Sequence, residues 1–360
     1  YGDVPFKIEA VIKGSSDMLD ATSYNGNLNI TTFNEACVSQ FDFVADENSG
    51  ISSEERRDIV ALDKLDWADG VWSTNAGWDL NTARFDMGAC GLQNSMVCFG
   101  GYTGSTTVAV TELFDGSSCT TNGAWDLNTA RSYLGGFGIK NSAVSVGGDT
   151  THAGAEVDDV EIWNGSLWSV ANVIPTNLSV PLSSGILNAG LICGGYNGFA
   201  KMATTYKFDG TNWSTAGGWD LNSGRVSGGA CGSQLSTLIA GGQGAGYLTS
   251  TEIFNGSAWA YSTELSSANG LLGLSGIYNS CIAFGGNGGA WEQNSEFFNG
   301  FVWSASSDLS EAKQKVSSSG ISSSALCIGG SATGSASAIL EKYNTQKTLP
   351  SSANLKWLWR

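Results

Sequence analysis

The chain has 360 residues, of which 49 are Gly and only 4 are Pro, and its formal net charge is −16. Phosphate backbones and anionic lipid surfaces repel a protein this acidic, which disfavours nucleic-acid binding and attachment to a membrane through basic residues. A hydrophobic content of 41% argues against disorder, and no apolar run approaches the roughly 18 residues of a membrane-spanning helix. The sequence begins with Tyr1 and has no apolar signal segment there, which we interpret as a processed product whose targeting signal is missing. Few Lys and abundant Gly, Ser, Thr and Asn favour an extracellular protein, secreted or attached to a surface.

Residues 1–27 lie outside the repeat that fills the rest of the chain, and we treat them as an N-terminal strand extension with a linker. Apolar and mostly polar residues alternate in its first part, with the apolar ones at Val4, Phe6, Ile8, Ala10 and Ile12. This two-residue period predicts an amphipathic β-strand, and such a strand needs the edge of a sheet as its partner. That edge belongs either to the same molecule or to a neighbouring copy, which the strand would then join head to tail.

From residue 28 onwards the sequence repeats itself. Runs such as Thr111–Gly116 and Thr251–Gly256 share the pattern Thr-Glu-apolar-Phe-Asp/Asn-Gly. The Asp or Asn recurs at positions 69, 115, 164, 209, 255, 299 and 344, so successive copies are 44 to 49 residues apart. A Gly pair after a short apolar run forms a second signature, which begins at positions 100, 147, 194, 241, 285 and 329. A repeat of this length indicates a supersecondary unit that packs against its neighbours.

Each period is expected to form four short strands. The first strand follows an Arg in three copies, namely Arg84, Arg131 and Arg225, and the second ends at the Gly pair. The third carries the Glu-x-Phe run, whose alternation suits one buried face. The fourth follows an Asn-Gly or Asp-Gly hairpin turn and carries a Trp in most copies. Such units cannot bury both faces alone, so they are expected to pack around an axis as a β-propeller.

Seven Asp/Asn positions against six Gly pairs leave the number of blades open between seven and six. Residues 36–47 align with residues 230–242 with one deletion, and an Asp-Glu dipeptide then stands in place of a Gly pair. We therefore predict an all-β, seven-bladed propeller over residues 28–360, whose first blade is degenerate and spans about residues 28–78. The alternative is six blades with a decorating N-terminal segment. The outer strand of the last blade is expected within residues 354–359.

The segments that lead into the first strands carry a longer motif. Trp-Asp-Leu-Asn-Thr-Ala-Arg occurs at 78–84 and 125–131, and Trp-Asp-Leu-Asn-Ser-Gly-Arg at 219–225. With the Gly pairs and the Trp, these motifs resemble the kelch family of β-propellers over about residues 28–358, in the form found in environmental phage and bacterial surface or fibre proteins. The resemblance implies the fold but no particular activity. The usual Tyr before the Gly pair is absent, since Phe99 stands there in one copy, so no binding site of a family member is carried over.

The residue inventory limits catalytic and metal centres. The chain has a single His, His152, whereas the copper site of galactose oxidase, a kelch-like propeller, needs two His. A Ser–His–Asp triad would have to use His152, but no nucleophile elbow accompanies it, so we expect an exposed loop histidine. Cys and His lack metal-ligand spacing, and the acidic stretches 46–48 and 156–159 lack the spacing of a calcium loop. We predict a non-enzymatic protein with no catalytic residue, cofactor or metal.

The cysteines and the sequons each allow two interpretations. Most of the eight cysteines recur at equivalent strand positions, which is typical of small buried residues; the one candidate disulfide is Cys90 with Cys98, on adjacent strands. Five Asn-x-Ser/Thr sites either carry glycans in a secreted protein or arise from the chemistry of Asn-Gly-Ser turns. These candidate acceptors are Asn29, Asn164, Asn177, Asn212 and Asn255.

Two kinds of function fit this sequence. The first is an extracellular structural protein, a self-assembling fibre or filament subunit linked to its own copies through the N-terminal strand. The second is a glycan- or receptor-binding propeller of a phage tail fibre or a bacterial surface adhesin. For the second, the candidate ligand contacts are the aromatic residues that follow or flank Gly pairs: Tyr102, Tyr196 and Trp291. Neither function involves nucleic acid or insertion into a membrane.

Overall fold

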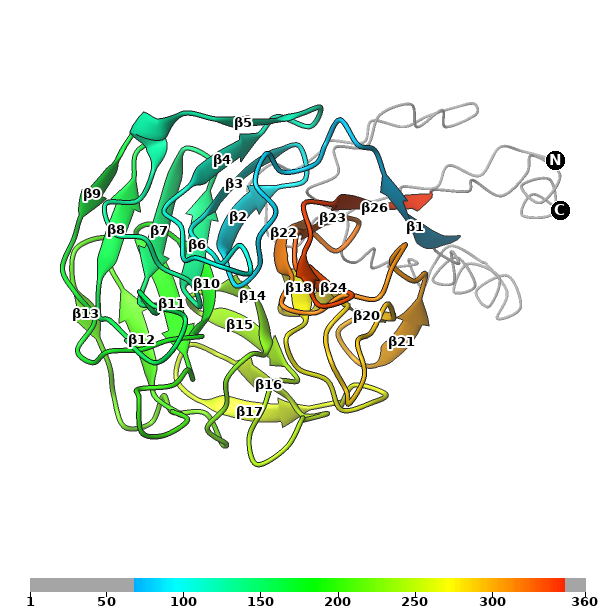
Figure 1. Cartoon of the computed structure of the whole chain (residues 1–360). Coiled ribbons are helices and arrows are strands. Elements are labelled where there is room, and N and C mark those ends of the chain that lie inside the picture. The colour runs from blue at the N-terminus through cyan, green and yellow to red at the C-terminus, as the bar shows by residue number, and fades with distance from the viewer. Residues whose placement is uncertain (1–67, 347–360) are drawn as a thin grey trace, which may run out of the picture. The chain divides into compact units, whose positions relative to one another are not determined.

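Six four-stranded antiparallel sheets form a ring in the computed structural model, which describes residues 68–346. In Figure 1 the colour runs around this ring, so that the blue β1 lies beside the red β26. The fold is therefore a six-bladed β-propeller, all-β apart from short turns such as the 3-10 turn η2 (Gly123–Trp125). Within the described residues, no helix is long and apolar enough to cross a membrane.

Each blade is numbered from its innermost strand outwards. Blade 1 contains β2 (Gly88–Leu92), β3 (Ser95–Phe99), β4 (Thr111–Phe114) and β5 (Cys119–Thr121). Blade 2 contains β6 (Gly135–Ile139), β7 (Ser142–Val146), β8 (Val160–Trp163) and β9 (Trp168–Val170). Blade 3 contains β10 (Leu182–Ile186), β11 (Ala189–Cys193), β12 (Thr205–Phe208) and β13 (Trp213–Ser214). Blade 4 contains β14 (Gly229–Ser233), β15 (Ser236–Ala240), β16 (Thr251–Phe254) and β17 (Trp259–Ser262). Blade 5 contains β18 (Gly273–Ile277), β19 (Ser280–Phe284), β20 (Ser295–Phe298) and β21 (Trp303–Ser306). Blade 6 contains β22 (Ser317–Ile321), β23 (Ser324–Ile328), β26 (Leu340–Gln346) and β1 (Ala68–Thr74), and the hairpin of β24 (Ser331–Ala332) and β25 (Ser335–Ala336) lies between β23 and β26.

The prediction of seven blades is wrong, and the alternative of six is correct. The sequence pattern counts Asp69 and Asn344 as two blades, but β1 and β26 are neighbours in one sheet, with Val71 opposite Asn344. Blade 6 therefore takes its outer strand from the N-terminal side of the ring and its other three from the C-terminal side. This outer position, which we expected residues 354–359 to fill, is occupied by β1. Residues 28–67 and 354–359 lie outside the described residues.

Backbone and side-chain contacts of β1 stabilise its pairing in blade 6. The amide of Gly70 donates to the Tyr343 hydroxyl at 3.2 Å, and the Trp72 ring packs edge-on against Phe284 with centroids 4.7 Å apart. Trp72 Nε1 also donates to Ser295 Oγ of blade 5 at 3.0 Å. The closing strand thus binds both its own blade and the preceding one.

The recurring glycine near the end of each inner strand is a demand of the backbone. Gly91 has φ of +117°, and a Cβ at this position would lie 2.3 Å from the Ser95 carbonyl oxygen across the hairpin. Only Gly adopts this conformation without strain. The equivalent glycines, all with positive φ, are Gly138, Gly185, Gly232, Gly276 and Gly320.

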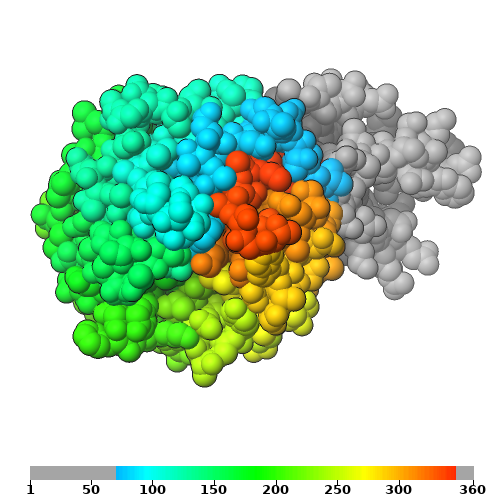
Figure 2. Space-filling model, viewed as in Figure 1, coloured from blue at the N-terminus to red at the C-terminus, as the bar shows by residue number. Residues whose placement is uncertain are grey.

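The hydrophobic core lies between neighbouring blades. Trp168 of blade 2 packs edge-on against Phe99 of blade 1, with centroids 4.7 Å apart, and donates from Nε1 to Thr111 Oγ1 at 3.0 Å. Trp259 of blade 4 makes the same bond to Thr205 of blade 3 at 2.9 Å. Trp168 and Trp259 therefore each join their own blade to the preceding one, and Figure 2 shows the blades packed side by side in chain order.

Candidate functional site

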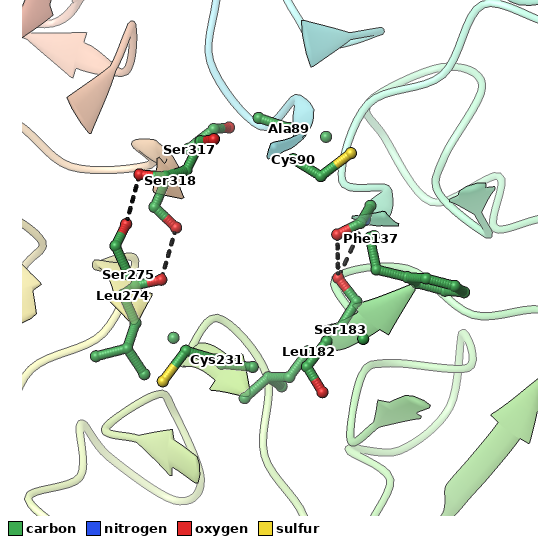
Figure 3. A pocket seen from close by; sticks show the side chains of 18 of the residues that line it. Ala89, Cys90, Phe137, Leu182, Ser183, Cys231, Leu274, Ser275, Ser317 and Ser318 are labelled. Atoms are coloured by element: carbon green, nitrogen blue, oxygen red, sulfur yellow. Dashed lines mark hydrogen bonds between the residues drawn. The ribbon is translucent and has the colours of Figure 1, made fainter. Parts of the chain in front are cut away.

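The inner strands enclose a central channel of about 240 Å³, lined mainly by Gly, Ala and Ser and by backbone. Figure 3 looks along it: Ser183 exchanges hydrogen bonds with the backbone of Gly136 at 2.9–3.0 Å, and Ser318 Oγ donates to the Leu274 carbonyl at 2.9 Å. These hydroxyl groups bond to neighbouring inner strands and hold the blades together. No charged side chain lines the channel among the described residues.

A ring of six residues surrounds one end of the channel, directly before the first channel-lining residue of each blade. All six are non-glycine residues with φ of +53° to +60°: Asp86, Tyr133, Val180, Ser227, Leu271 and Lys315. Their backbones are linked, as where the amide of Tyr133 donates to the Asp86 carbonyl at 2.8 Å and that of Lys315 to the Leu271 carbonyl at 2.8 Å. We call this set the mouth ring. Non-glycine residues in this conformation are strained, and such residues gather at functional sites.

His152 lies against the mouth ring rather than in solvent, so the expectation of an exposed loop histidine is wrong. Its imidazole is stacked between Tyr102, at 3.9 Å between centroids, and Tyr133, at 4.3 Å. Ser132 Oγ lies 2.9 Å from Nδ1, and Asp86 Oδ2 lies 3.9 Å from Nε2. Only 14% of the His152 side chain is exposed.

Lys315 completes this cluster from blade 6. Its Nζ lies 3.2 Å from Asp86 Oδ2 and 3.3 Å from the Tyr133 hydroxyl, and it stands 4.7 Å from the centre of the Phe85 ring. Blades 6, 1 and 2 thus contribute charged and aromatic side chains to the mouth ring, whereas blades 3, 4 and 5 contribute Val, Ser and Leu. We call Asp86, Tyr102, Tyr133, His152 and Lys315 the mouth cluster.

Burial shifts the protonation of the mouth cluster. It raises the pKa of Asp86 to about 6, although the Lys315 charge acts in the opposite direction. It lowers the pKa of His152 to about 4, and the Lys315 charge adds to that effect. Burial also lowers the pKa of Lys315, but the charge of Asp86 and the contact with Tyr133 more than compensate and the pKa is raised. At neutral pH the cluster is therefore a Lys–Asp ion pair beside a neutral imidazole.

The arrangement resembles a catalytic triad in composition but not in access. Within residues 68–346, Ser132 is the only hydroxyl bonded to His152, and it is fully buried. A nucleophile has to reach its substrate, so Ser132 cannot act as one in this conformation. Among the described residues, no group of three or more His, Cys, Asp or Glu side chains could hold a metal ion.

The three aromatic residues predicted as ligand contacts lie in the loops between second and third strands of alternate blades. Tyr102 packs within the mouth cluster, where His152 covers one face of its ring. The Tyr196 hydroxyl donates to the Gly198 carbonyl at 3.0 Å, and Trp291 forms a bridge with Asn287. The structure thus does not gather the three into one site. Phe199, which sequence reasoning missed, is 93% exposed at the tip of the Tyr196 loop.

The predicted disulfide is wrong, because Cys90 and Cys98 are free and belong to opposite faces of one sheet. Cys90 pairs with Val97, and Cys98 with Ala89. Adjacent residues alternate between faces, so the two thiols point apart. Burial raises the pKa of both thiols, to about 11 for Cys98 and further for Cys90.

The predicted glycosylation acceptors within the described residues are exposed: Asn164, Asn177, Asn212 and Asn255. Asn164 Oδ1 accepts from the amides of Ser166 and Leu167 at 2.9–3.0 Å, and Asn255 Oδ1 makes the same two bonds in its own turn. These bonds give the Asn a role in the turn, which accounts for the recurrence of the motif. Asn29 and the predicted assembly strand, Val4 to Ile12, lie outside the described residues.

Sequence reasoning missed most of the mouth cluster, although a signal existed. The mouth ring residue stands two positions after each Arg84-type residue, in a column where the six copies differ from one another. A position that varies between copies of an otherwise strict repeat is not required by the fold, so its residues can serve a specific function. No protein-family model matches this chain, and no curated protein matches it. The assignment as a β-propeller therefore rests on the six sheets themselves.

Proposed function

We propose that this chain is a non-enzymatic, extracellular structural protein, a kelch-type propeller that assembles into fibres through its N-terminal segment. Its partner is another copy of itself. The alternating residues from Val4 to Ile12 pair with a sheet edge of the neighbouring propeller by strand addition. A head-to-tail contact of this kind repeats without closing and gives a filament.

One observation carries the proposal: every sheet of the ring is complete with four strands drawn from residues 68–346. Blade 6 receives its fourth strand from β1, so none of the six sheets needs a strand from residues 4–12. Closure of the ring was the alternative use for that segment, so the six complete sheets support pairing with a neighbouring copy instead. The burial of Ser132 beside the single His supports a role without catalysis.

Electron microscopy and light scattering of the full chain test the proposal. Removal of residues 1–13 is expected to give monodisperse propellers where the full chain gives ordered filaments. The double variant Phe6→Asp/Ile8→Asp is expected to act like the deletion, because it places charge on the apolar side of the strand. Lys7→Ser/Glu9→Ser changes the polar side of the same strand and is the matched control, which should still form filaments.

Filaments of unchanged length from the deletion variant would overturn the proposal, as would a full chain that stays monomeric at high concentration. Circular dichroism of each variant separates loss of assembly from loss of the fold. A deletion that unfolds the ring would show that the segment belongs to the propeller itself.

The second candidate is recognition of a glycan by the loops around the mouth ring. The almost fully exposed ring of Phe199, next to Tyr196, favours it, because an aromatic face that the fold leaves uncovered suits stacking on a sugar. Binding to a glycan array that Phe199→Ala or Trp291→Ala abolishes, while Thr106→Ala does not, would support this function. Absence of binding by the full chain would leave only the structural proposal.

A further inference from the structure

A buried ion pair recurs at one position in the blades. A cationic side chain just before the first strand contacts the Glu at the second position of the third strand. Arg84 lies 3.2 Å from Glu112, Arg131 lies 2.9 Å from Glu161, and Lys313 lies 2.8 Å from Glu341, and Arg225 contacts Glu252. All eight side chains are buried.

Two of the arginines, Arg131 and Arg225, each also bond to two carbonyl groups beside the Gly pair, whereas Arg84 bonds to one, that of Val110. Arg131 donates to the carbonyl of Gly147 at 2.6 Å and to that of Asp159 at 2.9 Å, and Arg225 donates to Gly241 at 3.0 Å and Ser250 at 3.1 Å. One carboxylate and two carbonyl oxygens thus surround the guanidinium groups of Arg131 and Arg225. The repeat builds an oxygen-lined position for a cation in blades 2 and 4.

Blade 3 replaces both members of the pair. Leu178 stands in place of the Arg and Tyr206 in place of the Glu, and both are buried in the hydrophobic core. Exchange of a buried ion pair for packed apolar groups is a known neutral solution. Because Tyr206 replaces the Glu, blade 3 has no buried carboxylate at this position for a cation to neutralise.

Blade 5 replaces only one member. Asn269 stands in place of the Arg, as its carbonyl bond to Gly242 at 2.8 Å shows, while Glu296 keeps the carboxylate. Asn269 Nδ2 donates to the Gly285 carbonyl at 2.8 Å, which is one of the bonds that the arginines make. Ser266 donates its amide to Glu296 Oε2 at 3.0 Å. No described cationic side chain pairs with Glu296.

The shorter side chains leave a cavity of about 10 Å³. Its lining includes Asn269, Ala283, Glu292, Asn294 and Glu296. Ala283 pairs with Glu296 across the sheet, where the other blades carry Cys, Ser or Ile. With the Asn269 side chain in place, the volume matches a single particle of the size of a water molecule.

We propose that this cavity binds one small monovalent cation, of the ammonium or potassium class, in place of the missing arginine nitrogen. Glu296 supplies the charge and the carbonyl of Asn294, which matches that of Asp159 and Ser250, supplies a neutral oxygen. Glu292 also lines the cavity and adds to the negative charge there. The space admits only one water-sized particle, whereas Mg²⁺ requires near-octahedral coordination and retains its water, so a small monovalent ion without its hydration shell is the better fit. The site is independent of assembly and of the mouth cluster.

Thermal unfolding of the full chain in ammonium, potassium and tetramethylammonium chloride, at one ionic strength, tests the site. A bound ion stabilises the folded state, so the unfolding temperature should be roughly 2 °C or more higher in ammonium or potassium than in tetramethylammonium, which is too large for the cavity. Asn269→Arg places a guanidinium there and is expected to abolish the difference. Glu296→Gln removes the carboxylate that pairs with the cation in the other blades and should abolish the difference too, even if the first variant folds poorly.

Glu264→Gln is the matched control, because Glu264 is an exposed carboxylate that bonds to Thr249 outside the cavity. It should retain the full difference between salts. Equal unfolding temperatures of the natural chain in all three salts, or a difference that persists in Glu296→Gln, would overturn the proposal. A crystal soaked in rubidium chloride should give an anomalous peak beside Glu296, and its absence would assign the cavity to water.

Discussion

Blades 4 and 5 are neighbours with nearly the same backbone, yet they treat the same carboxylate differently. In blade 4, Glu252 is fully buried and Arg225 contacts it. In blade 5, Glu296 is only partly buried, and the side chain that would neutralise it has been shortened to Asn269. The propeller therefore does not depend on any one ion pair. Each blade requires either that its buried Glu is neutralised by a cation or that the Glu and the cationic side chain are both replaced, as in blade 3.

Removal of one partner in blade 4 is expected to have the largest effect. Arg225→Leu leaves Glu252 buried without a counter-charge, which should lower the free energy of unfolding by about 3–5 kcal/mol. Denaturant unfolding followed by Trp fluorescence measures this loss. The double variant Arg225→Leu/Glu252→Tyr copies blade 3 and should recover most of it; a double variant as unstable as the single one would contradict the comparison.

Restoration of the missing partner in blade 5 should have a smaller, opposite effect. Asn269→Arg is expected to raise the free energy of unfolding by about 1–2 kcal/mol in tetramethylammonium chloride, because it fills the cavity and pairs Glu296. The same denaturant experiment measures it. Asn269→Leu fills the space without charge, so an equal gain from this variant would show that packing alone is responsible.

The bond at Trp168 between blades 2 and 1 tests whether neutral contacts between blades contribute less to stability than the buried charges do. Trp168→Phe keeps the ring against Phe99 but loses the bond from Nε1 to Thr111. We expect a loss of about 1 kcal/mol. Trp125→Phe, in η2 between blades 1 and 2, serves as the control and should cost less, because the Trp125 indole nitrogen donates to no group among the described residues.

The mouth cluster offers the smallest effect and a dependence on pH. Because the pKa of His152 falls from 6.5 to about 4 on folding, its contribution to stability is present above pH 6.5 and is lost as the pH falls towards 4. Because the pKa of Asp86 rises from 3.8 to about 6, its contribution is present below pH 3.8 and is lost as the pH rises through 6. Between these limits the two trends oppose each other, so Asp86 and His152 together add little net pH dependence to the stability of the natural chain.

Single variants should separate the two trends. Relative to the natural chain, Asp86→Asn should lose stability from pH 6.5 to 4, since only His152 then titrates, and His152→Gln should gain stability over the same range. The unfolding temperature at several pH values measures both. If the unfolding temperatures of the two variants and the natural chain change with pH in parallel, the pH dependence arises instead from Lys315, Tyr133 and Asp149, which also face His152.

The sequence predicted the propeller, its strand types and the Gly pairs, because each is a local requirement that recurs in every copy. It did not predict the number of blades, because Asp69 and Asn344 look like parts of two units and only pairing across the ring joins them. The mouth cluster was missed for a similar reason. Its members Asp86, His152 and Lys315 come from three blades. Comparison of the repeat copies emphasises the residues that they share, so residues present in only one copy were overlooked.

The closure of blade 6 also determines how the ring responds to force. Ala68 and Gln346 are paired at the same end of β1 and β26, so tension applied between these two residues breaks the strand pair one hydrogen bond at a time. If the force is instead applied at residue 68 and at a different blade, it acts along β1 and loads all hydrogen bonds between β1 and β26 at the same time. In a fibre that pulls on residue 68 from one side and on a distant blade from the other, the pairing of β1 with β26 would therefore resist the larger force.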